Sequence, residues 1–171
     1  MDPLPFTHAL LSPAPHADIP DDQRIFEPFI GSWVLDVRWY GPGEELQRQE
    51  EGEWHFARVL EGRGIQDVWI VPPRGRREAG AYEYGTSLRF HDPALGAWRS
   101  TWIGPMHGAV LTFTARRRGE AVVLETTEGI TPARRWSFRD MTPSTFTWLH
   151  EAREGGEWRL VQSFAARRVV A

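Results

Sequence analysis

The sequence predicts an all-β protein built as a single up-and-down antiparallel barrel of about eight to ten strands, preceded by a short N-terminal helix. From Ser32 onward, successive segments place an aromatic or aliphatic residue at every second position, which is typical of strands with one buried face. Short turns containing Gly, Pro and Asp separate these segments. The chain also holds nine Trp and nine Phe, residues that favour pleated, half-buried surfaces.

The first part of the chain lacks this alternation. Residues 1–20 are rich in proline, and we expect them to form an extended arm. A short helix is predicted over residues 23–30, capped by Asp21 or Asp22 and ended by Gly31. The barrel domain is then expected to occupy residues 21–171 together with this helix.

The first strand is predicted from the row Trp33, Leu35, Val37 and Trp39. The next two strands form a hairpin around residues 61–64. Its predicted register places the large residues on one face and sets Arg58 directly opposite Asp67.

A second hairpin turns at Asp92 and Pro93, with Arg89 on its outward face. Its inward residues are predicted to be Tyr82, Tyr84, Thr86, Leu88, Phe90, Trp98, Ser100 and Trp102.

The last strands follow the same rule. A turn at residues 118–119 is expected to pair Phe113 with Leu124. Trp136 and Phe138 then face Phe146 and Trp148. The final hairpin, around residues 154–156, is predicted to pair Trp148 with Gln162 and to turn Trp158, Leu160, Gln162 and Phe164 inward.

Closure follows from the connections. They are short and contain no second helical stretch, which excludes an α/β fold. A long meander has two exposed edges, and closing it into a barrel removes both. A barrel of this size has room for one small ligand.

Composition excludes several classes of function. A net charge of −3 with interspersed charges argues against a nucleic-acid partner. The absence of Cys excludes disulfides and thiolate sites, and the six His show no metal-ligand spacing, so no metal and no cofactor are expected. Neither a signal peptide nor a membrane span is visible, so we expect a cytoplasmic protein. The proline-rich arm makes a homodimer a candidate assembly.

One motif points to a known superfamily. The segment Gly31-Ser32-Trp33 at the start of the first strand, with Arg167 and Arg168 in the last, resembles the calycins, which include lipocalins and fatty-acid-binding proteins. The turn from Asp92 to Trp98 is similar to that of bacterial calycin-like families without assigned function. The resemblance implies a barrel in which Trp33 closes one end and an Arg, assigned to Arg168, packs over it.

Inward polar and aromatic positions form the candidate ligand site. They are Arg58, Asp67, Trp69, Tyr82, Tyr84, Ser100, Trp102, Arg134, Trp148, His150 and Gln162.

Several of these residues allow two interpretations. Arg58 and Asp67 form either an internal ion pair or an anchor for a ligand. His150 is either a hydrogen-bonded core residue or a proton-transfer group, with Tyr84 as a second catalytic candidate. His107 is either a solvated turn residue or part of a gate at one barrel end.

Three functions remain open. The first is a module that binds a small, largely apolar aromatic or acyl ligand. The second is a cofactor-independent isomerase, cyclase or decarboxylase, with His150 or a Tyr as acid–base and Arg58 stabilising an oxyanion. The third is a dimeric structural domain whose barrel is filled by its own Trp and Phe. The volume of the interior separates the first two from the third.

Overall fold

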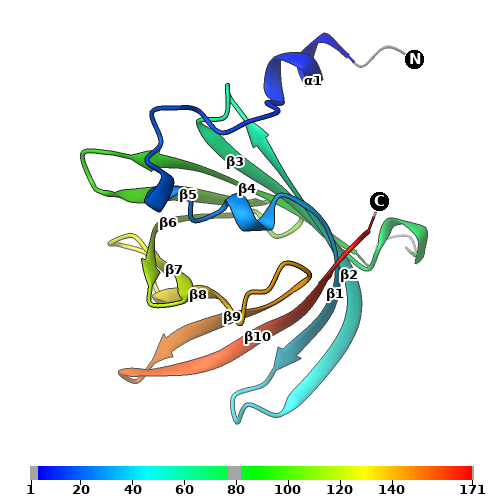
Figure 1. The fold of residues 1–171 in the computed structure, drawn as a ribbon. Helices are drawn as coiled ribbons and strands as arrows, with labels where there is room; N and C mark the ends of the chain where they lie inside the picture. The colour runs from blue at the N-terminus through cyan, green and yellow to red at the C-terminus, as the bar shows by residue number, and fades with distance from the viewer. Residues whose placement is uncertain (1–3, 77–81, 171) are drawn as a thin grey trace.

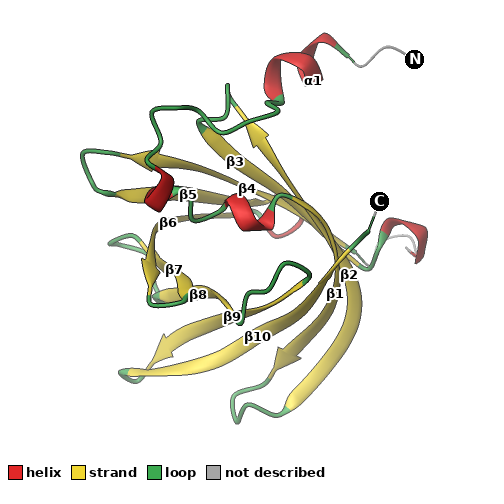
Figure 2. Ribbon diagram, viewed as in Figure 1, coloured by secondary structure: helices red, strands yellow, loops and turns green. Residues whose placement is uncertain are grey.

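Ten antiparallel strands close into one barrel in the computed structural model, which describes residues 4–76 and 82–170 (Figures 1 and 2). Neighbours in the barrel are neighbours in the chain, and the last strand pairs with the first, so the predicted fold class is confirmed. The strands are β1 Gly31–Tyr40, β2 Leu46–Val59, β3 Gly64–Val71, β4 Glu83–Asp92, β5 Ala97–Gly104, β6 Ala109–Arg118, β7 Ala121–Thr126, β8 Arg134–Arg139, β9 Thr145–Glu154 and β10 Glu157–Arg168.

The N-terminal segment differs from the prediction. An α-helix, α1 (Pro5–Leu10), lies within the arm that we expected to be extended, and proline at a first helical position is compatible with it. The predicted helix over residues 23–30 is instead two 3-10 turns, Asp21–Gln23 and Glu27–Phe29. Pro28 explains the difference, because it has no N–H to donate within a continuous helix.

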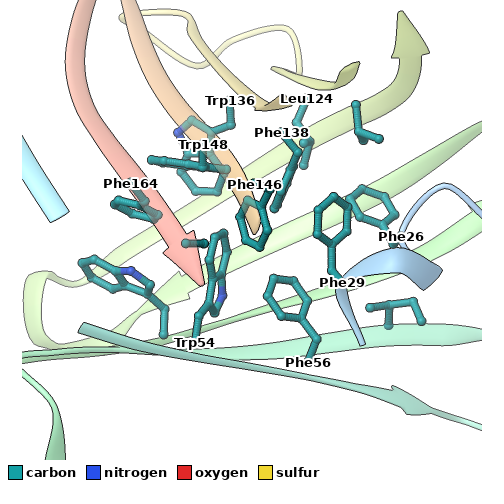
Figure 3. Packing of buried hydrophobic residues seen from close by; sticks show 14 of the residues in the cluster. Phe26, Phe29, Trp54, Phe56, Leu124, Trp136, Phe138, Phe146, Trp148 and Phe164 are labelled. Carbon is teal, nitrogen blue, oxygen red and sulfur yellow. The ribbon is translucent and has the colours of Figure 1, made fainter. Parts of the chain in front are cut away.

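Aromatic side chains fill one half of the barrel (Figure 3). Phe26 and Phe29, from the segment before β1, enter the barrel at the end where β1 begins. The Phe29 ring lies 4.3 Å from that of Phe138, and the Phe26 ring lies 5.2 Å from that of Trp98. Figure 1 shows this blue segment lying across the barrel opening. We call Phe26 and Phe29 the plug.

The plug is tied to the barrel by two indole groups. Trp33 Nε1 donates a hydrogen bond to the carbonyl of Phe29 (2.8 Å), and Trp98 Nε1 donates one to the carbonyl of Gln23 (2.7 Å). Both indoles are almost fully buried, so their N–H groups need these acceptors. One end of the barrel is therefore closed.

The hairpin between β2 and β3 is shifted by two residues from the predicted register. Phe56, not Arg58, lies opposite Asp67, and Arg58 lies opposite Ile65. A shift of two keeps every side chain on its predicted face, because side chains alternate with a period of two. The predicted pairing of Arg58 with Asp67 is therefore wrong.

Strand β4 is turned the other way from the prediction. Gly85, Ser87 and Arg89 are buried, whereas Leu88 and Phe90 are 38% and 47% exposed. Apolar residues alone favour the opposite orientation, but the inward one lets Arg89 reach the buried Asp67. An unpaired carboxylate in the core would cost more than the exposure of two apolar side chains.

The hairpins β6–β7 and β9–β10 also differ from the predicted register. Phe113 lies opposite Thr126 rather than Leu124. Trp148 pairs with Phe164 rather than Gln162. Next to the turn the pairing is already shifted by one residue, with Leu160 opposite Glu151, and a bulge between Leu160 and Gln162 adds the second residue. Before the bulge the faces are exchanged. The Trp158 ring packs against the guanidinium of Arg135 on β8, 4.4 Å away. Because the next residue of β8, Trp136, faces inward, Arg135 and with it Trp158 lie on the outer face of the barrel.

Candidate ligand-binding cavity

A cavity of about 270 Å³ occupies the barrel end opposite the plug. Its rim is made where strands begin or end away from the plug, at Glu83, Gly104, Ala109 and Arg134. The aromatic lining consists of Trp39, Trp54, Trp69, Tyr84, Trp102, Trp136, Trp148 and Phe164. Polar side chains in the lining are Glu83, Ser87, His107, Arg134, His150 and Gln162.

Three rings in mutual contact form the floor of the cavity. The Trp148 ring lies parallel to that of Phe164 with 4.2 Å between centroids, and the Trp54 ring meets Phe164 edge-on at 5.5 Å. Figure 3 shows these rings next to Phe138 and Phe146, which contact the plug. The floor therefore separates an open half of the barrel from a solid half.

His150 is held neutral in this cavity. Burial, together with the positive charges of Arg134 and Arg159, lowers its pKa to about 3, against the opposing effect of a hydrogen bond with Gln162 on the neighbouring strand. Its Nε2 is buried and has no hydrogen-bond partner in the described part of the chain. At pH 7 the imidazole is neutral, with one donor and one acceptor nitrogen, and its protonation state does not change in the neutral range.

Four indole N–H groups in the lining lack acceptors. They belong to Trp54, Trp69, Trp136 and Trp148, which are each 8% exposed or less, and no described residue accepts from them. The indole of Trp33, in the solid half, has its acceptor, so indole donors go unpaired in the cavity lining rather than throughout the barrel.

Arg134 is the cation of the cavity wall. Its backbone N–H donates to Thr126 Oγ1 (2.9 Å), which fixes the first residue of β8. Its guanidinium forms no ion pair with any described residue, whereas the next residue, Arg135, points outward and pairs with Glu151 at 2.9 Å. Arg134 therefore brings an uncompensated positive charge to the cavity.

The opposite side of the rim carries a histidine and a carboxylate close to each other. His107 Nε2 lies 3.6 Å from Glu83 Oε1, and both residues line the opening. His107 thus lies at a barrel end, as the sequence indicated, beside a carboxylate. The rim therefore carries a positive charge at the start of β8, on Arg134, and a negative charge at the start of β4, on Glu83.

Seven of the predicted ligand-site residues lie together in this lining: Trp69, Tyr84, Trp102, Arg134, Trp148, His150 and Gln162. Four others do not line it. Arg58 lies near the plugged end, where its Nε donates to Glu27 Oε2 (2.8 Å). Tyr82 precedes β4, and Asp67 and Ser100 lie in the solid half.

The buried charge of the solid half is the pair formed by Asp67 and Arg89. Arg89 Nη2 donates to Asp67 Oδ2 at 2.5 Å, and both residues are 1% exposed. The guanidinium also lies 5.0 Å from the Phe26 ring and 5.6 Å from the Phe56 ring. This pair therefore joins the barrel wall to the plug and does not line the cavity.

Sequence reasoning missed several lining residues. Ser87 was missed because β4 was assigned the wrong face. Trp39 belonged to the first inward row, and its place at the end of that row could have marked it as a rim residue. Glu83 and Met106 carried no comparable signal, because they lie where a strand starts and in the turn Pro105–His107.

The closed end carries the motif on which the resemblance rested. The Arg168 guanidinium lies 4.1 Å from the centre of the Trp33 ring, and Arg168 donates to the carbonyls of Pro28, Ile30 and Pro143, each at 2.7 Å. Gly31 has a φ of 122°, and a Cβ there would meet Arg168 Nη1 at 2.9 Å. Glycine at this position thus leaves room for the arginine.

Comparison with known proteins shows which solved fold this barrel resembles. No family model matches the chain, and no curated protein matches it. Among solved structures, the S-type phycobiliprotein lyase CPES from Guillardia theta superimposes with a TM-score of 0.57 and 14% sequence identity, over 86% of this chain and 92% of that one. The chain has a calycin-type barrel fold. At this identity the likeness concerns the fold alone.

Over residues 4–76 and 82–170, no group of three or more His, Asp or Glu side chains is arranged to hold a metal ion. None of the helices in the described segments has the length and apolarity needed to cross a membrane.

Proposed function

We propose that the protein binds a small, largely apolar ligand, aromatic or acyl, inside the open half of the barrel. The observation that carries this proposal is the cavity of about 270 Å³ with its aromatic walls. A cavity of about 150 Å³ in a protein core holds benzene, and drug-sized ligands occupy about 300 Å³ or more. The volume therefore suits a molecule of one or two rings, or a short acyl chain.

The two alternatives find less support. A structural domain with a filled barrel does not fit an open half of this volume. An enzyme with His150 or a Tyr as acid–base and Arg58 as oxyanion donor needs both groups at one substrate. Arg58 is bound to Glu27 at the other end, and His150 stays neutral well below pH 7.

Fluorescence titration with prodan, a neutral naphthalene ketone, tests the proposal. Binding in the cavity shifts the emission of prodan to the blue and saturates at one molecule per chain. Ala109→Trp places an indole in the cavity opening and is expected to weaken binding at least tenfold.

The matched control is Ala165→Trp, which adds the same indole at an exposed position of β10 and is expected to leave binding unchanged. Absence of a saturable blue shift, or equal affinities for the two variants, would show that the cavity is not the binding site.

A further inference from the structure

We infer that the ligand is an aromatic carboxylate of one or two rings, whose carboxylate pairs with Arg134 and whose ring system lies between the indoles of the cavity. This inference rests on the proposed function and narrows it, because it selects an aromatic anion over an acyl chain. It is carried by the unpaired donors, the charge and the shape of the cavity.

The unpaired donors argue against a purely hydrocarbon occupant. Trp54, Trp69, Trp136 and Trp148 keep their N–H groups buried without acceptors, and so does the Nε2 atom of His150. Native proteins satisfy nearly all buried polar groups with protein, water or ligand. These atoms have almost no accessible surface from the cavity, so each can pair only when its ring rotates toward an occupant that offers acceptor oxygens or π-faces. An alkyl tail offers neither and leaves the groups unsatisfied.

Charge on the β8–β10 side of the cavity selects an anion. Arg134 has no ion-pair partner in residues 4–76 and 82–170. Arg159 acts on His150 from the same side, but its charge is matched by Glu154 at 2.9 Å. Glu83 lies at the other side of the rim, next to His107. An arginine with a free planar fork favours a carboxylate, which it can bind through two parallel hydrogen bonds.

The shape of the cavity selects a flat molecule. Its walls are rings, with Trp69 and Trp102 6.1 Å apart and Trp102 and Trp136 6.0 Å apart between centroids. Aromatic ligands stack on such faces and meet them edge-on. With about 270 Å³ available, two fused rings and a carboxylate fit, whereas a long extended chain does not.

The test is displacement of bound prodan at pH 7.5 by three probes that differ in one property each. They are 2-naphthoate, the neutral 2-naphthalenemethanol and decanoate. Because the two naphthalenes share a ring system, their ratio of affinities measures the contribution of the carboxylate. We expect 2-naphthoate to bind at least tenfold more tightly than either of the others.

Substitutions test whether Arg134 is the source of the preference for the carboxylate. Arg134→Gln is expected to reduce the preference for 2-naphthoate over 2-naphthalenemethanol to threefold or less, mainly through a loss of affinity for 2-naphthoate. Arg134→Lys keeps the charge without the fork and should retain an intermediate preference. The control is Arg117→Gln, which removes a charge from an exposed position at the plugged end and should change neither affinity.

A second readout is independent of affinity. A carboxylate bound between Arg134 and His150 raises the pKa of the imidazole, because it offsets the positive charge that now lowers it. The ¹⁵N shifts of the His150 ring are expected to show a higher pKa with 2-naphthoate than with 2-naphthalenemethanol.

The outcomes separate this inference from the proposed function. Equal binding of 2-naphthoate and its alcohol, stronger binding of decanoate, or an unchanged preference in Arg134→Gln would each overturn the inference while prodan binding stands. If prodan itself does not bind, the proposed function fails and the inference fails with it.

Discussion

The buried pair of Asp67 and Arg89 gives the sharpest test of how this barrel is held together. Asp67→Asn removes the negative charge and leaves the Arg89 guanidinium at 1% exposure, with its Nε and Nη1 already lacking partners among the described residues. Breaking a buried pair by removing one partner costs about 3–5 kcal/mol. Arg89→Met leaves the Asp67 carboxylate with the N–H of Ser87 at 2.9 Å and is expected to cost a similar amount.

The double variant Asp67→Asn, Arg89→Met should be far more stable than the sum of the two. It leaves no buried charge, and replacing such pairs with neutral groups of similar volume is often close to neutral. We expect its free energy of unfolding to lie within about 2 kcal/mol of the unmodified chain, which corresponds to a coupling energy of several kcal/mol.

Urea unfolding followed by Trp fluorescence measures these values, and an unchanged dependence on urea concentration verifies that the same transition is compared. Arg99→Met is the control, because it breaks an exposed pair with Asp92 and should cost less than about 1 kcal/mol. Single variants that each cost under about 1 kcal/mol, or a double variant that equals their sum, would refute the reasoning.

Three further predictions concern the closed end, the histidine and the cavity wall. Arg168→Met removes the cation over Trp33 and three carbonyl contacts, and should lower the free energy of unfolding by about 2–4 kcal/mol in urea. The low pKa of His150 in the fold means that the unfolded chain binds its proton first, so stability is present above pH 6.5 and falls toward pH 3; His150→Gln should reduce the loss between pH 7 and pH 5 by about 2 kcal/mol. Gly85→Ala adds a Cβ that overlaps the Trp102 ring, and should cost about 1–3 kcal/mol and weaken prodan binding.

Controls are available for each. Arg167→Met changes the neighbouring, exposed arginine and should alter stability by less than about 0.5 kcal/mol. His8→Gln removes a histidine outside the core and should leave the pH dependence unchanged. Gly96→Ala would show whether a loss seen at Gly85 reflects the ring, since no atom lies within 4 Å of a Cβ at Gly96; its φ of +60° adds a backbone cost but no contact with the cavity.

The architecture was predictable because most of its strands bury one face. In β1 the row Trp33, Leu35 and Val37 is almost fully buried, as its period of two indicated. Large residues at every second position leave one orientation with low energy, and short turns allow one topology. Register was harder, since a shift of two residues, as at Phe56 and Asp67, changes no side chain's face.

The site was predictable where it used aromatic residues and hidden where it used polar ones. In β4, Leu88 and Phe90 indicated the wrong face, because the requirement that overrides them lies on another strand, at Asp67. The bulge in β10 has no sequence signature, yet it brings Gln162 opposite His150. Long-range charge pairing and strand irregularities depend on neighbours that a local pattern does not contain.

The pairing of β1 with β10 also determines the order in which this molecule can be assembled. Of the ten strands, β1 leaves the ribosome first and β10 last, so β1 keeps an unpaired edge until β10 has been made. Arg168, which holds the carbonyls of Pro28 and Ile30, arrives with the same final strand. Barrel closure and these last contacts of the segment that carries the plug therefore form together, after the contacts made by Trp33 and Trp98 can already exist. Until then the nascent sheet exposes its tryptophan face and two open edges, the state in which this chain most needs protection from aggregation.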